Sequence, residues 1–305
     1  ALDMTELNIS YAIDHGVDMV ISHHPFLFKP IHDIDLSTCK GRMIENLIRH
    51  RITSFAAHTN LDSAVQGVND ALAEKLGLQE CKGFVPVMTY SSYKFTLYIT
   101  AAHAKLLKKK LDSLRGKDIE SYYVVDDADD FTENIRVEFR VPGQLVKQVK
   151  DMISSLDKSA KYDVYKLVNH GYKETMGRIG KFPFPMSVEE ALSYIKNKLE
   201  IPVLRYAGNR DRLVEKIAIL GGAGAEFAEV AKSMGADLYL AGDLKYHEAQ
   251  DAAMNGLVIA DGGHFYTERV IIPYLAKRLR DEFKTRGWNV GVLEDVRAKD
   301  IFHCV

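Results

Sequence analysis

Short apolar runs alternate with amphipathic stretches at both ends of the chain. In the first part, the apolar runs predict strands over 17–21 and 52–57, and a helical period predicts helices over 8–15, 42–49 and 68–76. The last part predicts strands over 216–220, 237–241 and 257–260, helices over 226–234 and 246–254, and a long helix ending near Phe283. Strands that alternate with helices are typical of a layered α/β domain, so we expect one built from two sequence halves.

The middle of the chain has a different order and an internal repeat. Residues 93–168 predict strand, helix, strand, strand, helix, strand. Apolar residues of the first half, Phe95, Leu97, Ile99, Leu107, Leu111 and Leu114, recur at a constant spacing as Val137, Phe139, Val141, Val149, Ile153 and Leu156. A β-α-β-β-α-β unit with two similar halves indicates a ferredoxin-like domain. We therefore predict an insert at 90–176, between an α/β first half at 1–89 and a second half at 177–305.

Composition narrows the classes of partner. The 305 residues are 47% hydrophobic and 27% charged, and the formal net charge is −2. This near-neutral balance gives no electrostatic reason to expect nucleic acid or a membrane surface as a partner. No apolar run approaches the roughly 18 residues that a membrane-spanning helix needs.

The cysteines and the first residues add two expectations. Cys39, Cys81 and Cys304 are few and far apart, which argues against a disulfide framework and fits a cytoplasmic protein. The opening Ala1-Leu2-Asp3-Met4-Thr5 is typical of the tail of a strand, so we expect native sequence to precede Ala1.

Histidines and carboxylates follow the ends of several predicted strands. They lie in four segments: Ser22-His23-His24-Pro25, His58-Thr59-Asn60-Leu61-Asp62, Gly242-Asp243-Leu244-Lys245-Tyr246-His247 and Gly263-His264-Phe265-Tyr266-Thr267-Glu268. Open α/β sheets bind their ligands at such strand ends, and neutral imidazole is the commonest metal ligand. The pattern predicts a metal centre with nitrogen and oxygen ligands.

Each of these residues also has an alternative role. His264 and Glu268 are four apart on one helix face and could share one ion or bracket two, or form an exposed pair. Asp62 could bridge two cations or cap a helix. His58 is a ligand or, as we prefer, an outer group that orients one. His247 could act as a general acid/base, bind substrate or be a surface histidine.

A glycine-rich loop also follows a predicted strand. Backbone N–H groups of Gly221-Gly222-Ala223-Gly224 could hold an anion at the start of the next helix. The loop lacks the dinucleotide-binding spacing, because Phe227 stands where that pattern needs a third glycine. A tight turn needed for packing is the simpler interpretation.

Together, these four histidine segments resemble the Nif-three-like family, many of whose members are labelled GTP cyclohydrolase 1 type 2 homologues. The resemblance implies a centre of two divalent ions, zinc, iron or manganese, in a homohexameric ring. Carried over residue by residue, the metal ligands would be His23, His24, Asp62, His264 and Glu268.

The resemblance also extends to the insert, with two departures. Longer bacterial members carry an inserted domain similar to the PII/CutA fold. The resemblance leads us to expect a helix and a first strand before Ala1, which the sequence given does not include. Its insert has Ser121-Tyr122-Tyr123-Val124-Val125-Asp126-Asp127 in place of a stretch rich in glycine and histidine.

Two classes of function fit these residues best. The first is a metal-dependent hydrolase that uses a metal-activated water on a small-molecule substrate such as a nucleotide, with His247 and His58 as catalytic groups. The second is a non-catalytic metal-binding ring with a regulatory or scaffold role. A ring that threads nucleic acid is disfavoured by the near-neutral charge.

Overall fold

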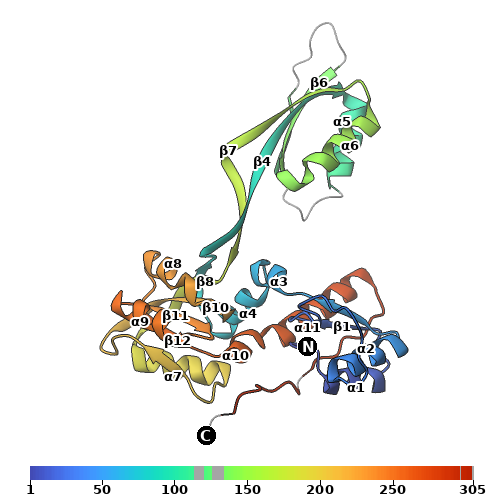
Figure 1. Ribbon diagram of the computed structural model, residues 1–305. Coiled ribbons are helices and arrows are strands. Elements are labelled where there is room, and N and C mark those ends of the chain that lie inside the picture. The colour runs from blue at the N-terminus through green and yellow to red at the C-terminus, as the bar shows by residue number, and fades with distance from the viewer. Residues whose placement is uncertain (113–119, 126–133, 296, 304–305) are drawn as a thin grey trace. The chain divides into compact units, whose positions relative to one another are not determined.

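The computed structural model describes residues 1–112, 120–125, 134–295 and 297–303. The chain forms two compact units (Figure 1). The α/β unit contains residues 1–85 and 175–305, and the inserted unit contains residues 86–174.

The α/β unit is built on a mixed sheet with the strand order β3-β8-β10-β11-β12-β9. Its strands are β3 (Gln79–Lys82), β8 (Arg178–Ser187), β9 (Arg205–Ala207), β10 (Leu213–Ala223), β11 (Leu238–Gly242) and β12 (Val258–Asp261). Strands β10, β11 and β12 are parallel, while β3, β8 and β9 pair antiparallel with their neighbours.

Helices cover both faces of this sheet. Leu238 and Leu240 of β11 belong to one apolar cluster, and Tyr239 and Ala241 belong to another. The first cluster includes side chains of α4 (Val68–Lys75) and α7 (Val188–Leu199), and the second those of α8 (Ala228–Ser233) and α9 (Tyr246–Met254). Because a central parallel strand is buried on both faces, its sequence is a continuous apolar run.

A second, two-stranded sheet pairs β1 (Met19–Ser22) with β2 (Thr53–Ala56) in parallel. Helices α1 (Glu6–Asp14) and α2 (Cys39–Arg49) pack with Ile52 in a small apolar cluster. The chain start lies along β1, because the Ala1 amino group donates to the Ile21 carbonyl at 2.9 Å. This pairing agrees with the strand-like character of the first residues.

The predicted long helix after His264 is wrong in one respect, because it is two helices. α10 (His264–Glu268) ends before α11 (Ile271–Arg286) begins. Pro273 has no N–H to donate to the carbonyl of Arg269, so the helical hydrogen-bond ladder is interrupted there.

The inserted unit has the element order β-α-β-β-α-β. Its elements are β4 (Val85–Thr100), α5 (Ala101–Asp112), β5 (Glu120–Val125), β6 (Asn134–Pro142), the 3-10 turn η1 (Gly143–Leu145), α6 (Val146–Leu156) and β7 (Lys161–Met176). The sheet order is β5-β6-β4-β7. The ferredoxin-like and PII/CutA-like character of this unit stays a prediction.

The apolar repeat forms the core of the inserted unit. Phe95 lies opposite Phe139 across β4 and β6, and their rings stack with centroids 5.3 Å apart. Leu107 of α5 and Val149 of α6 are buried in the same cluster. Leu114 of the predicted repeat lies outside the described residues, as do Asp126 and Asp127.

No helix in the part of the chain that the structure describes is long and apolar enough to cross a membrane. Cys39 and Cys81 are free thiols, and Cys304 lies outside the described residues.

Candidate metal centre

Two parallel strands place the first group of candidate ligands. Ser22 at the end of β1 lies opposite Ala56 at the end of β2. The chain therefore delivers His23 and His58 to the same edge of this small sheet. Asp62 follows on the short helix α3 (Thr59–Ser63), one turn beyond His58.

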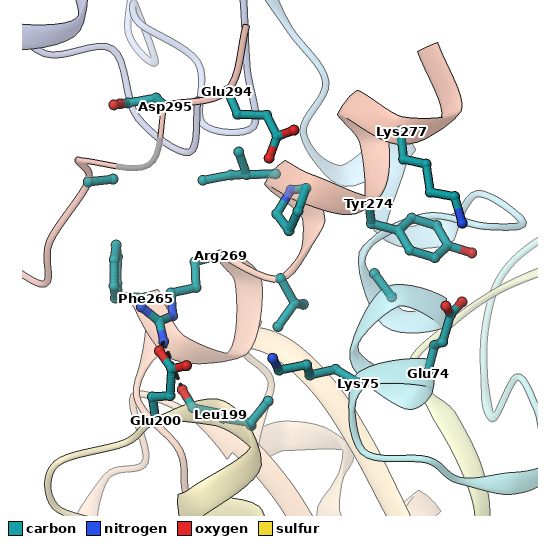
Figure 2. Close-up of a pocket in the computed structure, with 15 residues that line it drawn as sticks. Glu74, Lys75, Leu199, Glu200, Phe265, Arg269, Tyr274, Lys277, Glu294 and Asp295 are labelled. Atoms are coloured by element: carbon teal, nitrogen blue, oxygen red, sulfur yellow. Dashed lines mark hydrogen bonds and ion pairs between the residues drawn. The ribbon is translucent and has the colours of Figure 1, made fainter. Parts of the chain in front are cut away.

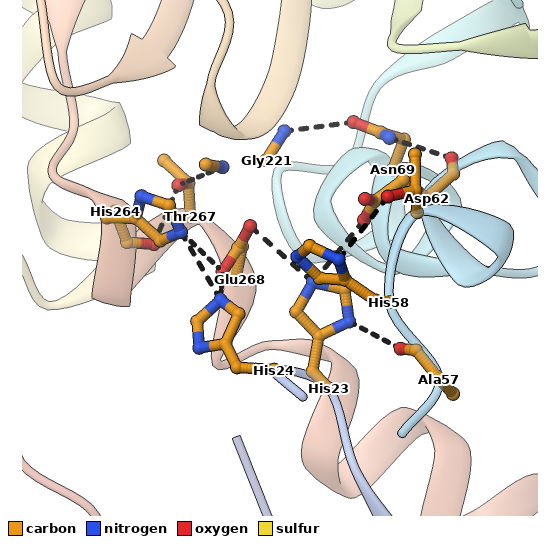
Figure 3. Close-up of polar contacts among 12 residues, drawn as sticks. His23, His24, Ala57, His58, Asp62, Asn69, Gly221, His264, Thr267 and Glu268 are labelled. Atoms are coloured by element: carbon orange, nitrogen blue, oxygen red, sulfur yellow. Dashed lines mark hydrogen bonds and ion pairs between the residues drawn. The ribbon is translucent and has the colours of Figure 1, made fainter. Parts of the chain in front are cut away.

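The large sheet places the second group. β12 ends at Asp261, and Gly263 then turns the chain into α10 with a φ of 74°, a conformation that favours glycine. His264 and Glu268 are the first and last residues of α10, four apart on one helix face. The ends of two sheets therefore meet around one cluster of side chains (Figure 3).

The candidate ligands form three overlapping groups. The groups are His23, His24 and His58; His24, His264 and Glu268; and His23, Asp62 and Glu268. Within each group, one ligand atom per residue lies within 4.8 Å of the others. The structure thus brings together all five residues that the resemblance implied as ligands, together with His58.

One nitrogen of each of three imidazoles is already engaged outside the cluster. Nδ1 of His23 lies 2.8 Å from the Ala57 carbonyl, that of His24 lies 2.7 Å from Asp3 Oδ1, and that of His264 lies 2.7 Å from Asp243 Oδ2. An Nδ1–H that donates to oxygen leaves the Nε2 lone pair free for a metal. All three Nε2 atoms lie on the inner side of the cluster.

The sequence analysis missed the roles of Asp3 and Asp243. Asp243 directly follows β11, so its place at a strand end was a signal that could have identified it. Asp3 carries no comparable signal, because its contact with His24 depends on the pairing of the chain start with β1.

Glu268 lies between the imidazoles. Its Oε2 is 2.9 Å from His24 Nε2 and 3.1 Å from His264 Nε2, and its Oε1 is 3.6 Å from His23 Nε2. Asp62 Oδ1 lies 3.5 Å from His23 Nε2. Glu268 is therefore shared by the group with His24 and His264 and the group with His23 and Asp62. The sequence had suggested this bridging position for Asp62.

Strong electrostatic coupling accompanies this geometry. Burial alone would raise the pKa of Glu268, but the neighbouring imidazoles of His23, His24 and His264 hold that pKa well below its usual range. Asp3 and then Glu268 raise the pKa of His24 to about 10. Glu268, and more weakly Asp243, raise the pKa of His264 to about 9. The ionised carboxylate of Glu268 is thus stabilised by positive charge beside it.

Within the part of the chain that the structure describes, two buried atoms of the cluster have no hydrogen-bond partner. They are Nε2 of His23 and Oδ1 of Asp62, which lie 3.5 Å apart. Leaving a buried polar atom unpaired costs about 1–3 kcal/mol, so their persistence needs a compensating group. A divalent cation would satisfy both atoms. Imidazole nitrogens and carboxylate oxygens suit such an ion, so these residues fit a metal centre.

His58 and His247 lie in different surroundings. The His58 ring centroid is 5.4 Å from that of His23 and 5.8 Å from that of His24, so it borders the cluster as either ligand or neighbour. Within the described residues, the recorded contacts of the His247 ring are with Gln250 and Tyr246 of its own helix. The structure does not bring His247 into the cluster, and its catalytic role stays a prediction.

Comparison with known proteins identifies the family. The profile of Duf34/NIF3 (NGG1p interacting factor 3) matches residues 1–299. This chain belongs to the Duf34/NIF3 family.

Several NIF3-family relatives are similar over nearly the whole chain. A protein of Halalkalibacterium halodurans named GTP cyclohydrolase 1 type 2 homolog is 32% identical, over 99% of this chain and 87% of its own length. A Bacillus subtilis protein of the same name is 31% identical, over 95% and 84%. The crystal structure of a Bacillus cereus protein related to NIF3 is 32% identical and superposes with a TM-score of 0.88, covering 100% of this chain and 88% of that one.

The glycine-rich segment of this NIF3-family chain supports the metal centre by packing. The N–H of Gly221 donates to Asn69 Oδ1 and that of Gly222 to Thr267 Oγ1, both at 3.0 Å. These two donors are therefore used within the protein rather than held free for an anion. Gly222 has a φ of 72°, and a Cβ there would lie far inside contact distance of Glu268 Oε1.

One cavity lies apart from the ligand cluster. It has a volume of about 630 Å³ and is lined by residues of α4, α10 and α11 together with Glu294, Asp295 and Ala298 (Figure 2). Phe265 and Arg269 of the α10 region line it, whereas the five candidate ligands do not.

We expect Gly222→Ala to remove bound metal and to destabilise the fold by about 1–3 kcal/mol. The added methyl group would displace Glu268 and would strain the backbone. Gly16→Ala is a matched control, because Gly16 has a similar φ of 62° but nothing within 4 Å of the added atom. Metal analysis and thermal unfolding of both variants test this. Equal metal content in the two variants would contradict the packing role of Gly222.

We expect Asp243→Asn to weaken metal binding roughly 10- to 100-fold, because the carboxylate that orients His264 is lost. Asparagine tolerates the left-handed backbone of Asp243, whose φ is 57°, so the fold should persist. Asp251→Asn on α9 is the control. Competition with a chromogenic chelator measures both affinities, and an unchanged affinity in Asp243→Asn would refute the orienting role.

Metal binding should release protons at pH 7 and should weaken as the pH falls. Without metal, the pKa values of about 10 for His24 and about 9 for His264 leave both imidazoles protonated at pH 7. A ligand imidazole must be neutral, so each Nε2 proton competes with the metal. Calorimetric titration with zinc in buffers of different ionisation enthalpy counts these protons, and a heat independent of buffer would contradict this prediction.

Proposed function

We propose that this chain binds two divalent cations, zinc, iron or manganese, and is a metal-dependent hydrolase of the GTP cyclohydrolase 1 type 2 family. The observation that carries the proposal is the position of Glu268, whose two carboxylate oxygens face different imidazoles. One ion would be held by His24, His264 and Glu268, and the other by His23, Asp62 and Glu268.

When bound, such ions act as Lewis acids and lower the pKa of a water molecule enough to supply hydroxide near neutral pH. The protein's own groups orient the ligands. Asp3, Asp243 and the Ala57 carbonyl hold a proton on Nδ1 of their histidines and so fix the direction of each Nε2. We also propose catalytic roles for His58, which borders the candidate ligands, and for His247, which lies on α9.

The exposure of the ligands supports a catalytic centre over a closed structural one. The side chains of His23 and Glu268 are 1% and 5% exposed, whereas those of His24 and His264 are 23% and 39% exposed. One side of the cluster is therefore buried and the other is open to solvent. Structural metal sites are closed by protein ligands, while catalytic sites keep an open position for substrate.

The substrate class comes from the relatives' names, which point to a nucleotide. A cyclohydrolase of this kind would hydrolyse the purine ring of GTP at C8. We also propose that the chain assembles as a homohexamer, because the family resemblance implies this state.

Asp62→Asn tests the hydrolase proposal. We expect the wild-type chain to bind two divalent ions and to turn over GTP or a related nucleotide. Loss of a residue that merely orients a metal ligand typically lowers metal affinity or activity about 10- to 100-fold. Loss of a ligand itself should therefore reduce the rate of turnover by about 100-fold or more. Elemental analysis and a nucleotide turnover assay measure both quantities.

Asp14→Asn is the control for this test, because Asp14 is exposed at the end of α1. Equal turnover in Asp62→Asn and wild type would refute the proposed metal role. Stoichiometric metal without turnover of any nucleotide or phosphoester would instead indicate the non-catalytic regulatory or scaffold protein.

A further inference from the structure

An irregular segment beside the metal centre exposes apolar side chains. Residues 26–38, between β1 and α2, form neither helix nor strand, and five of their apolar side chains are exposed: Leu27, Phe28, Ile31, Ile34 and Leu36. Several exposed apolar side chains in one segment beside a candidate site are typical of a binding surface.

The segment is anchored to α2 at both of its ends. Lys40 Nζ donates to the Phe26 carbonyl at 2.8 Å, and Arg42 donates to the Ser37 carbonyl at 2.8 Å. These bonds hold the backbone on either side of Phe28, while the Phe28 side chain itself remains 76% exposed. An anchored backbone limits the entropy lost when an exposed ring binds a ligand.

The ring of His58 contacts both Phe28 and two of the candidate metal ligands. The Phe28 ring centroid lies 6.3 Å from that of His58, at an interplanar angle of 89°. The His58 ring in turn lies beside His23 and His24, at 5.4 Å and 5.8 Å (Figure 3 shows His58 next to His23). A perpendicular contact with His58 occupies at most one face of the Phe28 ring, so the other face is available to a ligand.

We propose that Phe28 binds the substrate by stacking on a flat, unsaturated ring, while the ligand's reactive part reaches the open side of the metal cluster. This inference rests on the proposed function and adds a specificity-determining residue to it. Phe28 would bind a flat ring better than an aliphatic chain, because the face of the ligand ring and the face of the Phe28 ring are both planar and polarizable. Stacking of a base on an aromatic side chain tolerates many bases, so Phe28 selects a ring rather than guanine in particular.

The test compares ligands with and without a ring on the zinc-loaded chain. GTP, ATP and flavin mononucleotide carry a flat ring, whereas inorganic tripolyphosphate carries charge alone. We expect Phe28→Ala to weaken binding of a ring-bearing probe roughly 5- to 100-fold and to leave tripolyphosphate binding unchanged. Phe28→Trp should keep the affinity, and Phe28→Leu should lose most of it. Calorimetry measures each dissociation constant, and metal content confirms equal loading.

Phe302→Ala is the matched control, because Phe302 is 75% exposed in the C-terminal segment. The inference is overturned if no ring-bearing probe binds, if tripolyphosphate loses affinity equally, or if Phe28→Leu binds as wild type does. It is also overturned if Phe28→Ala changes the sedimentation coefficient without changing ring binding, because Phe28 would then pack against a second copy of the chain.

Binding and turnover measurements together distinguish a failure of this inference from a failure of the hydrolase proposal. Ring binding that depends on Phe28, in a protein without turnover, keeps this inference and removes the hydrolase. Turnover with an unchanged KM in Phe28→Ala keeps the hydrolase and removes this inference.

Discussion

The buried carboxylate of Glu268 is the constraint on which the site depends. Burying an ionised carboxylate is costly unless it is paired and hydrogen-bonded. Here three imidazoles supply that pairing, and their outer nitrogens are held by Asp3, Asp243 and the Ala57 carbonyl. A displacement of α10 would separate this carboxylate from His23 and His24, so the fold of the α/β unit and the geometry of the candidate centre are coupled.

The topology explains why the site can form from distant parts of the chain. Glu268 and His24 are separated by 244 positions in sequence and yet lie 2.9 Å apart. Parallel strands end at the same edge of their sheet, so loops after β1 and β2 converge, and so do those after β11 and β12. The inserted unit leaves the α/β unit after β3 and returns to it at β8, and both of these strands belong to the large sheet.

The two sides of the cluster have different physical roles. On the buried side, within the described residues, Nε2 of His23 and Oδ1 of Asp62 have no hydrogen-bond partner, and a bound cation would satisfy both atoms. The open side, with His24 and His264, gives access to solvent. The proposed hydrolase would use both sides, and the apolar segment at 26–38 borders the cluster through the contact of Phe28 with the ring of His58.

The sequence alone predicts the α/β class, because apolar runs such as 238–241 are continuous where both faces of a strand are buried. The apolar repeat, which includes Phe95 and Phe139, also predicted the core of the inserted unit, and the histidines and carboxylates at strand ends indicated the residue types of the candidate ligands. The position of Glu268 between the imidazoles, and the orientation of two of them by Asp3 and Asp243, became visible only in the folded structure. Periodicity records which face of an element is buried, whereas contacts between side chains far apart in sequence depend on how the sheets pack together.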